Sequence, residues 1–195
     1  SVSKAHAPLF KALRYDDKVL CRPGGAQPEL LADAGFIREA VKQNLWALDH
    51  AHEDVRADRS VLLDALSHTL YALDFGDKPA LIKDHAFMLQ AVRKNGRVLQ
   101  FADLPLRKDA GIVIAAVMHS GSALQYASEE LRNEYDLVLE AVKQDGMALE
   151  FASEVLKETA VLVTVAVEQN PGALRFASLA LRSDEDFVLG CVMSS

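Results

Sequence analysis

Glycine, proline and cysteine are scarce in this chain of 195 residues. It has 10 glycines, 6 prolines and 2 cysteines, while 50% of its residues are hydrophobic and 25% are charged. This composition excludes a disordered or collagen-like chain, and a globule of this length buries roughly 70% of its unfolded surface without a disulfide scaffold. Cys21 and Cys191 have no partner at metal-ligand or redox spacing, so we expect buried or idle thiols.

The chain also lacks an excess of positive charge and a long hydrophobic run. Its 21 basic residues face 28 acidic ones, and the net charge of -7 opposes nucleic-acid binding. The apolar runs from Ile112 to Met118 and from Ala160 to Val167 are far shorter than the roughly 20 residues of a transmembrane helix. Ser1 stands in place of methionine and no signal segment follows, so we expect a removed leader or a fragment. A soluble protein of the cytoplasm or an organelle is expected, with the compartment open.

What the chain does have is an internal repeat of 25 residues. Ala116 to Ser128 and Ala141 to Ser153 match column for column. Extending this register gives the following starts: Ala40, Ala65, Ala91, Ala116, Ala141 and Ala166, with a partial unit at Cys191. Such a period is typical of a repeat architecture, in which each unit buries its apolar face against its neighbours.

The repeat columns predict two helices of about ten residues in each unit. The first helix carries a stripe such as Leu137, Val138, Ala141 and Val142. A second stripe combines a leucine, a small residue and a later leucine at positions i, i+3 and i+7, as in Leu124, Ala127 and Leu131, and an aromatic residue precedes the small one. Strands over 111–117 and 161–167 are the less favoured reading, because the aligned segments contain Met, Leu, Gln, Glu and Ala.

Helix boundaries are marked in every unit. The expected N-caps of the first helices are Asp33, Asp58, Asp84, Asp109, Thr159 and Asp184, with Glu134 as a weaker substitute. Asn95-Gly96, Ser120-Gly121 and Asp145-Gly146 predict left-handed C-terminal turns, and Asn170-Pro171 stops a helix.

The predicted fold is therefore all-α, an α-solenoid of about six helix-turn-helix repeats of 25 residues. Residues 1–32 are expected to form an N-terminal arm that caps the first layer, with one short helix from Leu9 to Leu20. Residues 33–195 are expected to form the repeat domain, which ends in a half repeat. The apolar stripe of Asp184 to Met193 lacks a second helix of its own, so we expect downstream chain or another subunit to cover it, or the terminus to fray.

The repeat resembles a known family. Ala116 to Arg132, Ala141 to Lys157 and Ala166 to Arg182 match best the tandem repeats of domain of unknown function 4116 (DUF4116), and the likeness extends over about residues 33–193. The unit at Ala65 departs most, with Leu70 in the glycine column, Pro79 in the second helix and one inserted residue. The resemblance implies helical repeats and supplies no established activity and no catalytic residue.

Residues capable of chemistry give no clear site. His50 occupies the aromatic column, so a packed imidazole is favoured over a metal ligand, and the carboxylate pairs are expected to be solvated. A recurring basic column either forms a ladder or pairs locally with the acidic caps; its members are Arg56, Arg107, Arg132, Lys157 and Arg182. We therefore predict no catalytic, cofactor or metal residues and no enzyme.

The leading functional hypothesis is a non-catalytic scaffold or protein–protein interaction subunit whose partners are other protein subunits. Nucleic acid is not an expected partner, and peripheral association with a membrane complex stays open. The candidate contact positions flank the turn between the helices: Lys42, Gln43, Trp46, Arg93, Lys94, Arg97, Met118, His119, Lys143, Gln144 and Met147. Two alternatives remain, an accessory subunit of a large organellar, photosynthetic complex and an enzyme or ligand-binding module with a pocket near the arm or the Ala65 repeat.

Overall fold

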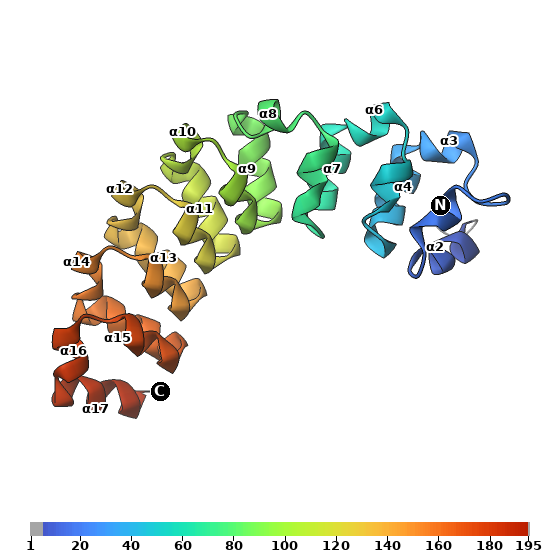
Figure 1. The fold of residues 1–195 in the computed structure, drawn as a ribbon. Coiled ribbons are helices and arrows are strands. Elements are labelled where there is room, and N and C mark those ends of the chain that lie inside the picture. The colour runs from blue at the N-terminus through green and yellow to red at the C-terminus, as the bar shows by residue number, and fades with distance from the viewer. Residues whose placement is uncertain (1–5, 195) are drawn as a thin grey trace. The chain divides into compact units, whose positions relative to one another are not determined.

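The protein is all-helical in a computed structural model that describes residues 6–194 (Figure 1). Helices make up 75% of the structure, and the described residues contain no strand. The alternative reading of two segments as strands is wrong, since both lie in helices: α11 (Ala110–His119) and α15 (Ala160–Gln169). The all-α prediction is confirmed.

The chain divides into two compact units, Ser1–Phe87 and Met88–Ser195. The first contains these helices: α2 (Ala7–Leu13), η1 (Asp17–Leu20), α3 (Pro28–Leu31), α4 (Ala34–Gln43), α5 (Ala47–His50), α6 (Glu53–Arg56), α7 (Arg59–Leu66), η2 (Leu70–Phe75) and α8 (Lys78–Leu81), where η denotes a 3-10 helix. α9 (His85–Lys94) crosses the boundary. The second unit continues with η3 (Gly96–Phe101), α10 (Leu104–Arg107), α11, η4 (Gly121–Tyr126), α12 (Glu129–Arg132), α13 (Tyr135–Gln144), η5 (Gly146–Phe151), α14 (Glu154–Lys157), α15, η6 (Pro171–Phe176), α16 (Leu179–Ser183) and α17 (Glu185–Ser194).

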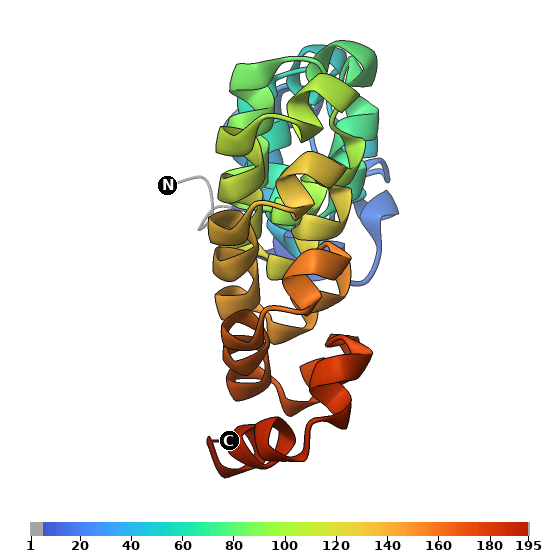
Figure 2. The ribbon, with the colours of Figure 1, turned by 90° about the vertical axis from the view of Figure 1, so that its left-hand side faces the viewer.

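The 25-residue period is visible in the element bounds of the second unit. The ten-residue helices α11, α13 and α15 begin at Ala110, Tyr135 and Ala160. α11 packs against α13 and α13 against α15, while η3, η4, η5 and η6 form a second row of neighbours (Figures 1 and 2). Each repeat of this unit thus contributes one long helix and one 3-10 helix to two adjoining rows.

The second half of each repeat is not the continuous ten-residue helix that the stripe predicts. In the repeats from Ala65 onward it is a 3-10 helix of six residues followed by a separate α-helix of four or five residues, as in η4 and α12. In the Ala40 repeat a four-residue α-helix, α5, stands in place of the 3-10 helix. Between η4 and α12 the backbone is extended at Ala127 (ψ 157°), and the Ser128 hydroxyl accepts a hydrogen bond from the N–H of Leu131 at 3.4 Å. The serine thus starts a new helix, because its side chain satisfies a free N–H there.

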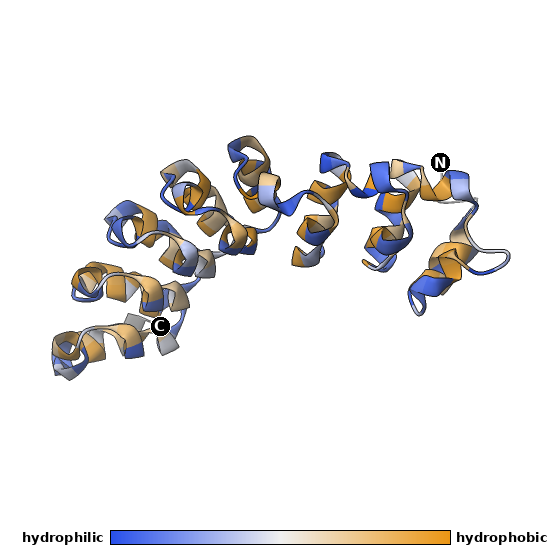
Figure 3. Ribbon diagram, turned by 45° about the horizontal axis from the view of Figure 1, so that its top comes forward, coloured by the Kyte–Doolittle hydropathy of each residue, from blue (hydrophilic) through white to orange (hydrophobic). Residues whose placement is uncertain are grey.

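The buried core follows the predicted columns. Ala116, Ala141 and Ala166 are fully buried, as are the leucines at 99, 124 and 149. The column of small residues is 2–7% exposed at Ala102, Ala127, Ala152 and Ala177. Figure 3 shows hydrophobic segments, in orange, beside hydrophilic ones, in blue, on the same helices. Burial of one face at a fixed period explains why the sequence repeats.

The N-cap predictions hold for the aspartates and fail at Thr159. Side chains of Asp33, Asp109 and Asp184 accept from the N–H three positions later at 2.8–3.0 Å. Thr159 accepts no such bond; its hydroxyl instead donates to the carbonyl of Val155 at 3.5 Å. Glu134, the weaker N-cap candidate, also accepts no hydrogen bond from the first N–H groups of its helix. An aspartate oxygen reaches the free N–H groups, whereas this threonine hydroxyl turns toward the preceding helix.

The glycines after the long helices do not form left-handed turns, because Gly24 is the one described residue with a positive φ (84°). The long helices end instead on an extended residue, such as Ser120 (φ -151°). A Cβ on Gly96, Gly121 or Gly146 would overlap the backbone carbonyl oxygen of Ala116, Ala141 or Ala166 in the next repeat. Glycine is required there for close approach between repeats.

Two sets of hydrogen bonds join each repeat of the second unit to the next. The N–H groups of Gly96, Gly121 and Gly146 donate to the side chains of His119 (3.2 Å), Gln144 and Gln169 (2.6 Å), 23 positions later. The N–H groups of Ser128, Ser153 and Ser178 donate to the carbonyls of Arg107, Arg132 and Lys157 at 3.0–3.1 Å. Backbone groups at each junction are therefore satisfied by the neighbouring repeat.

The arm contributes to the core of the first unit. The prediction of one helix from Leu9 to Leu20 is wrong, because α2 ends at Leu13 and a separate helix, η1, follows. The side chain of Asp16 caps η1 by accepting a hydrogen bond from the N–H of Lys18 at 3.0 Å. Phe10 stacks on Phe36 with ring centroids 5.2 Å apart. The domain boundary at residue 32 remains a prediction, although arm and first repeat share these buried contacts.

The Ala65 repeat forms its 3-10 helix and its short helix despite the sequence changes. Pro79 lies in the first turn of α8, where a missing N–H costs nothing. The irregularity falls at the end of α7, which has 8 residues instead of 10. The inserted residue lies between α8 and α9, whose first residues are Lys78 and His85, whereas α10 and α11 begin one residue closer together, at Leu104 and Ala110.

Candidate interaction surface

The predicted contact residues all lie at the surface of their own unit. Gln43 and Met147 are half-buried, and the others are exposed: Lys42, Trp46, Arg93, Lys94, Arg97, Met118, His119, Lys143 and Gln144. Lys42, Gln43 and Trp46 belong to the first unit and the others to the second. Trp46 precedes α5 and is 48% exposed.

Several of these residues have structural partners. The ammonium groups of Lys42 and Lys143 pair with Glu39 (2.6 Å) and Glu140 (2.8 Å) on their own helices. Gln43 accepts from the Arg14 guanidinium at 2.6 Å. His119 and Gln144 accept from glycine N–H groups at the repeat junctions. The polar members of the predicted set therefore contribute partly to folding.

The structure brings Arg93, Met118 and His119 together around a shallow hollow beside α11, which we call the α11 hollow. Its other lining residues are Gly111, Ile114 and Ala115, and its volume is about 500 Å³. Met118 is 66% exposed and Ile114 is 39% exposed. Both would gain from being covered, because burial of apolar area contributes about 25 cal/mol per Å².

The outward face of α11 differs from the same face of the neighbouring repeat. In α11 that face consists of Gly111, Ile114, Ala115 and Met118, and it contains no charged residue. The matching positions in α13, 25 residues later, are Asp136, Leu139, Glu140 and Lys143. Because the four buried positions of α11 are also apolar, this helix is hydrophobic on both sides, which is typical of a helix covered on both sides.

Sequence reasoning missed Ile114 and Ala115 because it placed contacts only beside the turn. The missed signal was the uncharged run from Ile112 to Met118, which exceeds what one buried stripe requires. One basic residue, Arg93, lines the hollow. No acidic residue lines it.

Four members of the recurring basic column make local contacts, but not with the acidic caps two positions later; the alternative of a basic ladder stays a prediction. Arg107 donates to the carbonyls of Gln100 (2.6 Å) and Ala102 (2.8 Å), and Arg182 donates to that of Ala177 (3.0 Å). Lys157 pairs with Glu154 at 2.8 Å, three positions before it. None of these bonds pairs a member of the column with the cap two positions later. Arg107 and Arg182 instead satisfy carbonyls at the end of the 3-10 helices, and Arg132 pairs with Glu129 at 3.9 Å.

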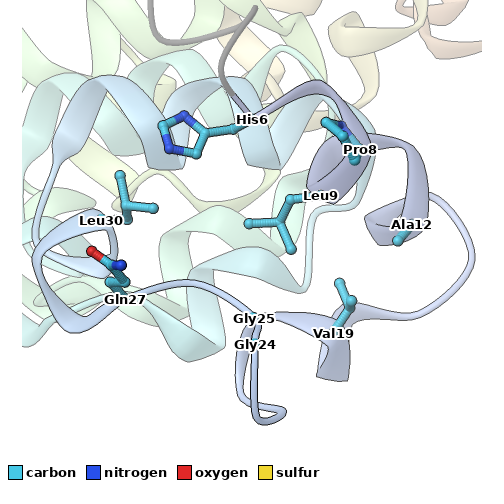
Figure 4. Close-up of a pocket in the computed structure, with 9 residues that line it drawn as sticks. All are labelled: His6, Pro8, Leu9, Ala12, Val19, Gly24, Gly25, Gln27 and Leu30. Atoms are coloured by element: carbon cyan, nitrogen blue, oxygen red, sulfur yellow. The ribbon is translucent and has the colours of Figure 1, made fainter.

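A second hollow lies in the arm, one of the places proposed for a ligand pocket (Figure 4). It has a volume of about 490 Å³ and is lined by His6, Pro8, Leu9, Ala12, Val19, Gly24, Gly25, Gln27 and Leu30. In Figure 4 Leu9 points into the space between His6 and Val19. Only His6 and Gln27 bring polar side chains, and His6 also packs edge-on against Phe36. This wall offers little polar recognition.

These observations define the protein as an all-α chain with tandem helical repeats of 25 residues. Residues 84–132 and 109–157 match the family model described as Domain of unknown function (DUF4116), so the expected resemblance is confirmed over 84–157. No curated protein and no solved structure matches the chain. Within the described part of the chain, we find no helix that is both long and apolar enough to span a bilayer, and no group of three potential metal ligands.

Proposed function

We propose that the repeats build an α-solenoid and that the protein is a non-catalytic interaction subunit that binds a protein partner at the α11 hollow. The solenoid is supported by the junction bonds of the second unit, which join each repeat to its immediate neighbour. Such an array presents an extended surface rather than a deep cavity, which suits an elongated partner.

The observation that carries the binding proposal is the uncharged outward face of α11. Surface helices of a monomer ordinarily alternate apolar and charged faces, as α13 does. Selection for stability alone gives no reason to expose Ile114 and Met118 together. A protein partner that covers these two side chains gives such a reason, because exposed apolar patches mark interaction sites.

The chemistry of the hollow defines the partner. Apolar side chains fit between Ile114 and Met118, and a carboxylate fits beside Arg93. We therefore propose a partner that presents an acidic amphipathic helix, which lays its apolar face along α11. The positive charge of Arg93 favours association with such an acidic segment, and salt weakens this effect.

The test exchanges the outward faces of two neighbouring repeats. Ala115→Glu combined with Met118→Lys gives α11 the residues that α13 carries at the same columns, including the pair formed by Glu140 and Lys143. Since α13 folds with these residues, the stability of the variant is expected to stay within about 0.5 kcal/mol of wild type. The matched control, Glu140→Ala with Lys143→Met, changes the same number of charges on α13.

Partners are identified by crosslinking mass spectrometry in the source cell and then titrated as purified proteins against each variant. We expect the α11 variant to weaken binding at least tenfold and the α13 control to leave it within a factor of two. Equal affinity of wild type and the α11 variant for every crosslinked partner would refute the proposal. So would crosslinks that map to other helices and avoid α11.

A further inference from the structure

The arm and the first repeat bring together a cysteine, a histidine and an aspartate. The Sγ atom of Cys21 lies 3.0 Å from Nδ1 of His50, and Nε2 of His50 lies 2.9 Å from Oδ2 of Asp17. Asp17 begins η1, Cys21 follows its last residue, and His50 ends α5. We call these three residues the Cys21–His50–Asp17 cluster.

The contacts determine which atoms carry protons. The hydrogen bond with His50 is the main cause that lowers the pKa of Asp17, and the positive charge of Lys18 adds to it, so Asp17 is a carboxylate near neutral pH. A carboxylate only accepts, which makes Nε2 of His50 the donor. In a neutral imidazole Nδ1 is then an acceptor, and the thiol of Cys21 donates to it. Hydrogen bonds thus link the thiol of Cys21 to a base, His50, and link this base to Asp17, which orients it.

This order of contacts is the one found in activated cysteine nucleophiles, where a third group orients the base. His50 is largely shielded, with 18% of its side chain exposed, while Cys21 is exposed. Another charged pair of the arm, Asp16 with Arg22 at 2.6 Å, is internally neutralised. Reagents in water therefore reach the Cys21 sulfur, while His50 is shielded and is held in position by its hydrogen bond with Asp17.

The repeat columns indicate that His50 is not required for packing. The same column contains Phe75, Phe101, Tyr126, Phe151 and Phe176 in the other repeats. A histidine at this one position, and beside the arm, is what makes the contact with Cys21 and Asp17. Sequence reasoning treated it as a substitute for phenylalanine, and it treated the exposed Cys21 as idle.

We propose that Cys21 is a peroxide-reactive thiol, activated by His50 as the base and by Asp17 as a positioning residue. The thiol proton moves to Nδ1 of His50, and the thiolate attacks one oxygen of hydrogen peroxide. The S–O bond forms as the O–O bond breaks, and the departing hydroxide takes the proton from His50 to give water. Cys21 is oxidised to a sulfenic acid, and the peroxide is reduced.

Hydrogen peroxide suits this site because it needs no binding pocket. The hollow in the arm is lined by Val19, Gly24 and Gly25, and its lining does not include Cys21. A larger acyl or peptide substrate requires donors that stabilise an oxyanion as well as a specificity pocket. The three residues suffice for a small oxidant that approaches an exposed sulfur.

The test measures the rate of Cys21 oxidation in the full chain by peroxide, with sulfenic acid trapped by dimedone and located by peptide mass spectrometry. Cys191, which is buried, serves as the internal reference in the same molecule. The key variants are His50→Phe, which installs the residue of the neighbouring columns, and Asp17→Asn. Circular dichroism checks that each variant remains folded. The same thiol in the chain unfolded by urea gives a second comparison that needs no variant.

At pH 6 an ordinary thiol, with a pKa near 8.5, is only ~0.3% thiolate. Transfer of the proton to His50 removes this limit, and the lower nucleophilicity of a stabilised thiolate offsets part of the gain. We expect Cys21 to react about tenfold faster at pH 6 in the wild type than in His50→Phe or in the unfolded chain, with Asp17→Asn between them. Above pH 9 the rates should converge.

Three results would overturn the proposal. The first is a wild-type rate at pH 6 equal to that of His50→Phe and of the unfolded chain. The second is oxidation of Cys21 no faster than that of Cys191. The third is rapid alkylation of Cys21 by iodoacetamide without sulfenic acid under peroxide, which would identify a nucleophile directed at another electrophile. Because the readout is local to the arm, it is independent of partner binding at α11.

Discussion

The close approach between repeats can be tested at a single glycine. Gly121 packs against the next repeat. A Cβ at this position would overlap the carbonyl oxygen of Ala141. It would also lie 2.8 Å from Cβ of Asp145 and 2.9 Å from Oε1 of Gln144. Since Gly121 has no positive φ, alanine is compatible with its backbone conformation. The substitution Gly121→Ala therefore isolates the packing effect.

Two opposing effects set the magnitude. Alanine stabilises by about 0.4–1 kcal/mol through the unfolded chain where the backbone permits it. Overpacking against a rigid backbone costs about 1–3 kcal/mol, and loss of the hydrogen bond from Gly121 to Gln144 costs about 0.5–1.5 kcal/mol more. The clash dominates, so we expect Gly121→Ala to lower the free energy of unfolding by roughly 1–3 kcal/mol.

Urea unfolding followed by circular dichroism measures the change, and hydrogen exchange localises it. Peptides from η4 and α13 should lose protection, whereas peptides from α2 and α4 should not change. Gly190→Ala is the matched control, because nothing lies within 4 Å of a Cβ at this helical glycine. It should stabilise by about 0.5–1 kcal/mol. A Gly121→Ala protein as stable as the wild type, or stabilised like the control, would show that glycine is not needed for this junction.

Three other predictions concern caps, carbonyl partners and pH. Asp109→Ala should cost about 1 kcal/mol in a urea titration because the cap to Ile112 is lost, whereas Thr159→Ala should stay within about 0.5 kcal/mol because no cap bond exists. Arg107→Lys should cost about 1 kcal/mol by thermal unfolding, since a lysine cannot donate to both carbonyls. Acid should destabilise the first unit. The N–H of Phe87 and the guanidinium of Arg59 lower the pKa of Asp84 in the folded protein. The stabilisation that the Asp84 carboxylate contributes is therefore present above the unfolded pKa near 4 and is lost as the pH falls through the folded-state pKa. Asp84→Asn should reduce the loss of unfolding free energy as the pH falls below the unfolded pKa near 4, and an unchanged pH dependence would contradict this assignment.

Much of the fold is predictable because burial is periodic. The stripe of Leu137, Val138, Ala141 and Val142 is buried as expected, and the aspartate caps begin the long helices. The continuity of the second helix is not predictable in the same way. Its apolar stripe has helical spacing, yet Ala127 is extended and Ser128 begins a new helix. Local hydrogen bonding of a serine competes with helix continuation, and hydrophobic periodicity contains no information on that competition.

The candidate sites show the same division. Met118 and His119 follow from their place beside the turn, and Ile114 follows only when α11 is compared with α13. The Cys21–His50–Asp17 cluster depends on how the arm folds onto the first repeat, and the arm has no repeat from which to infer contacts. One signal was available: His50 interrupts a column that is otherwise aromatic. A residue that breaks a structural column without loss of the fold indicates a local role.

The glycine column also limits where the closest packing between repeats occurs. Gly96, Gly121 and Gly146 all lie within residues 84–157, the segment that matches the family model. The same column contains Leu45 and Leu70 in the earlier repeats and Pro171 in the last one. A leucine fills the space into which a neighbouring carbonyl would fit, and Pro171 has no N–H to donate to a following repeat. The glycine-to-helix junction is therefore confined to three consecutive repeats, and its three glycines all lie in the segment that matches the family model.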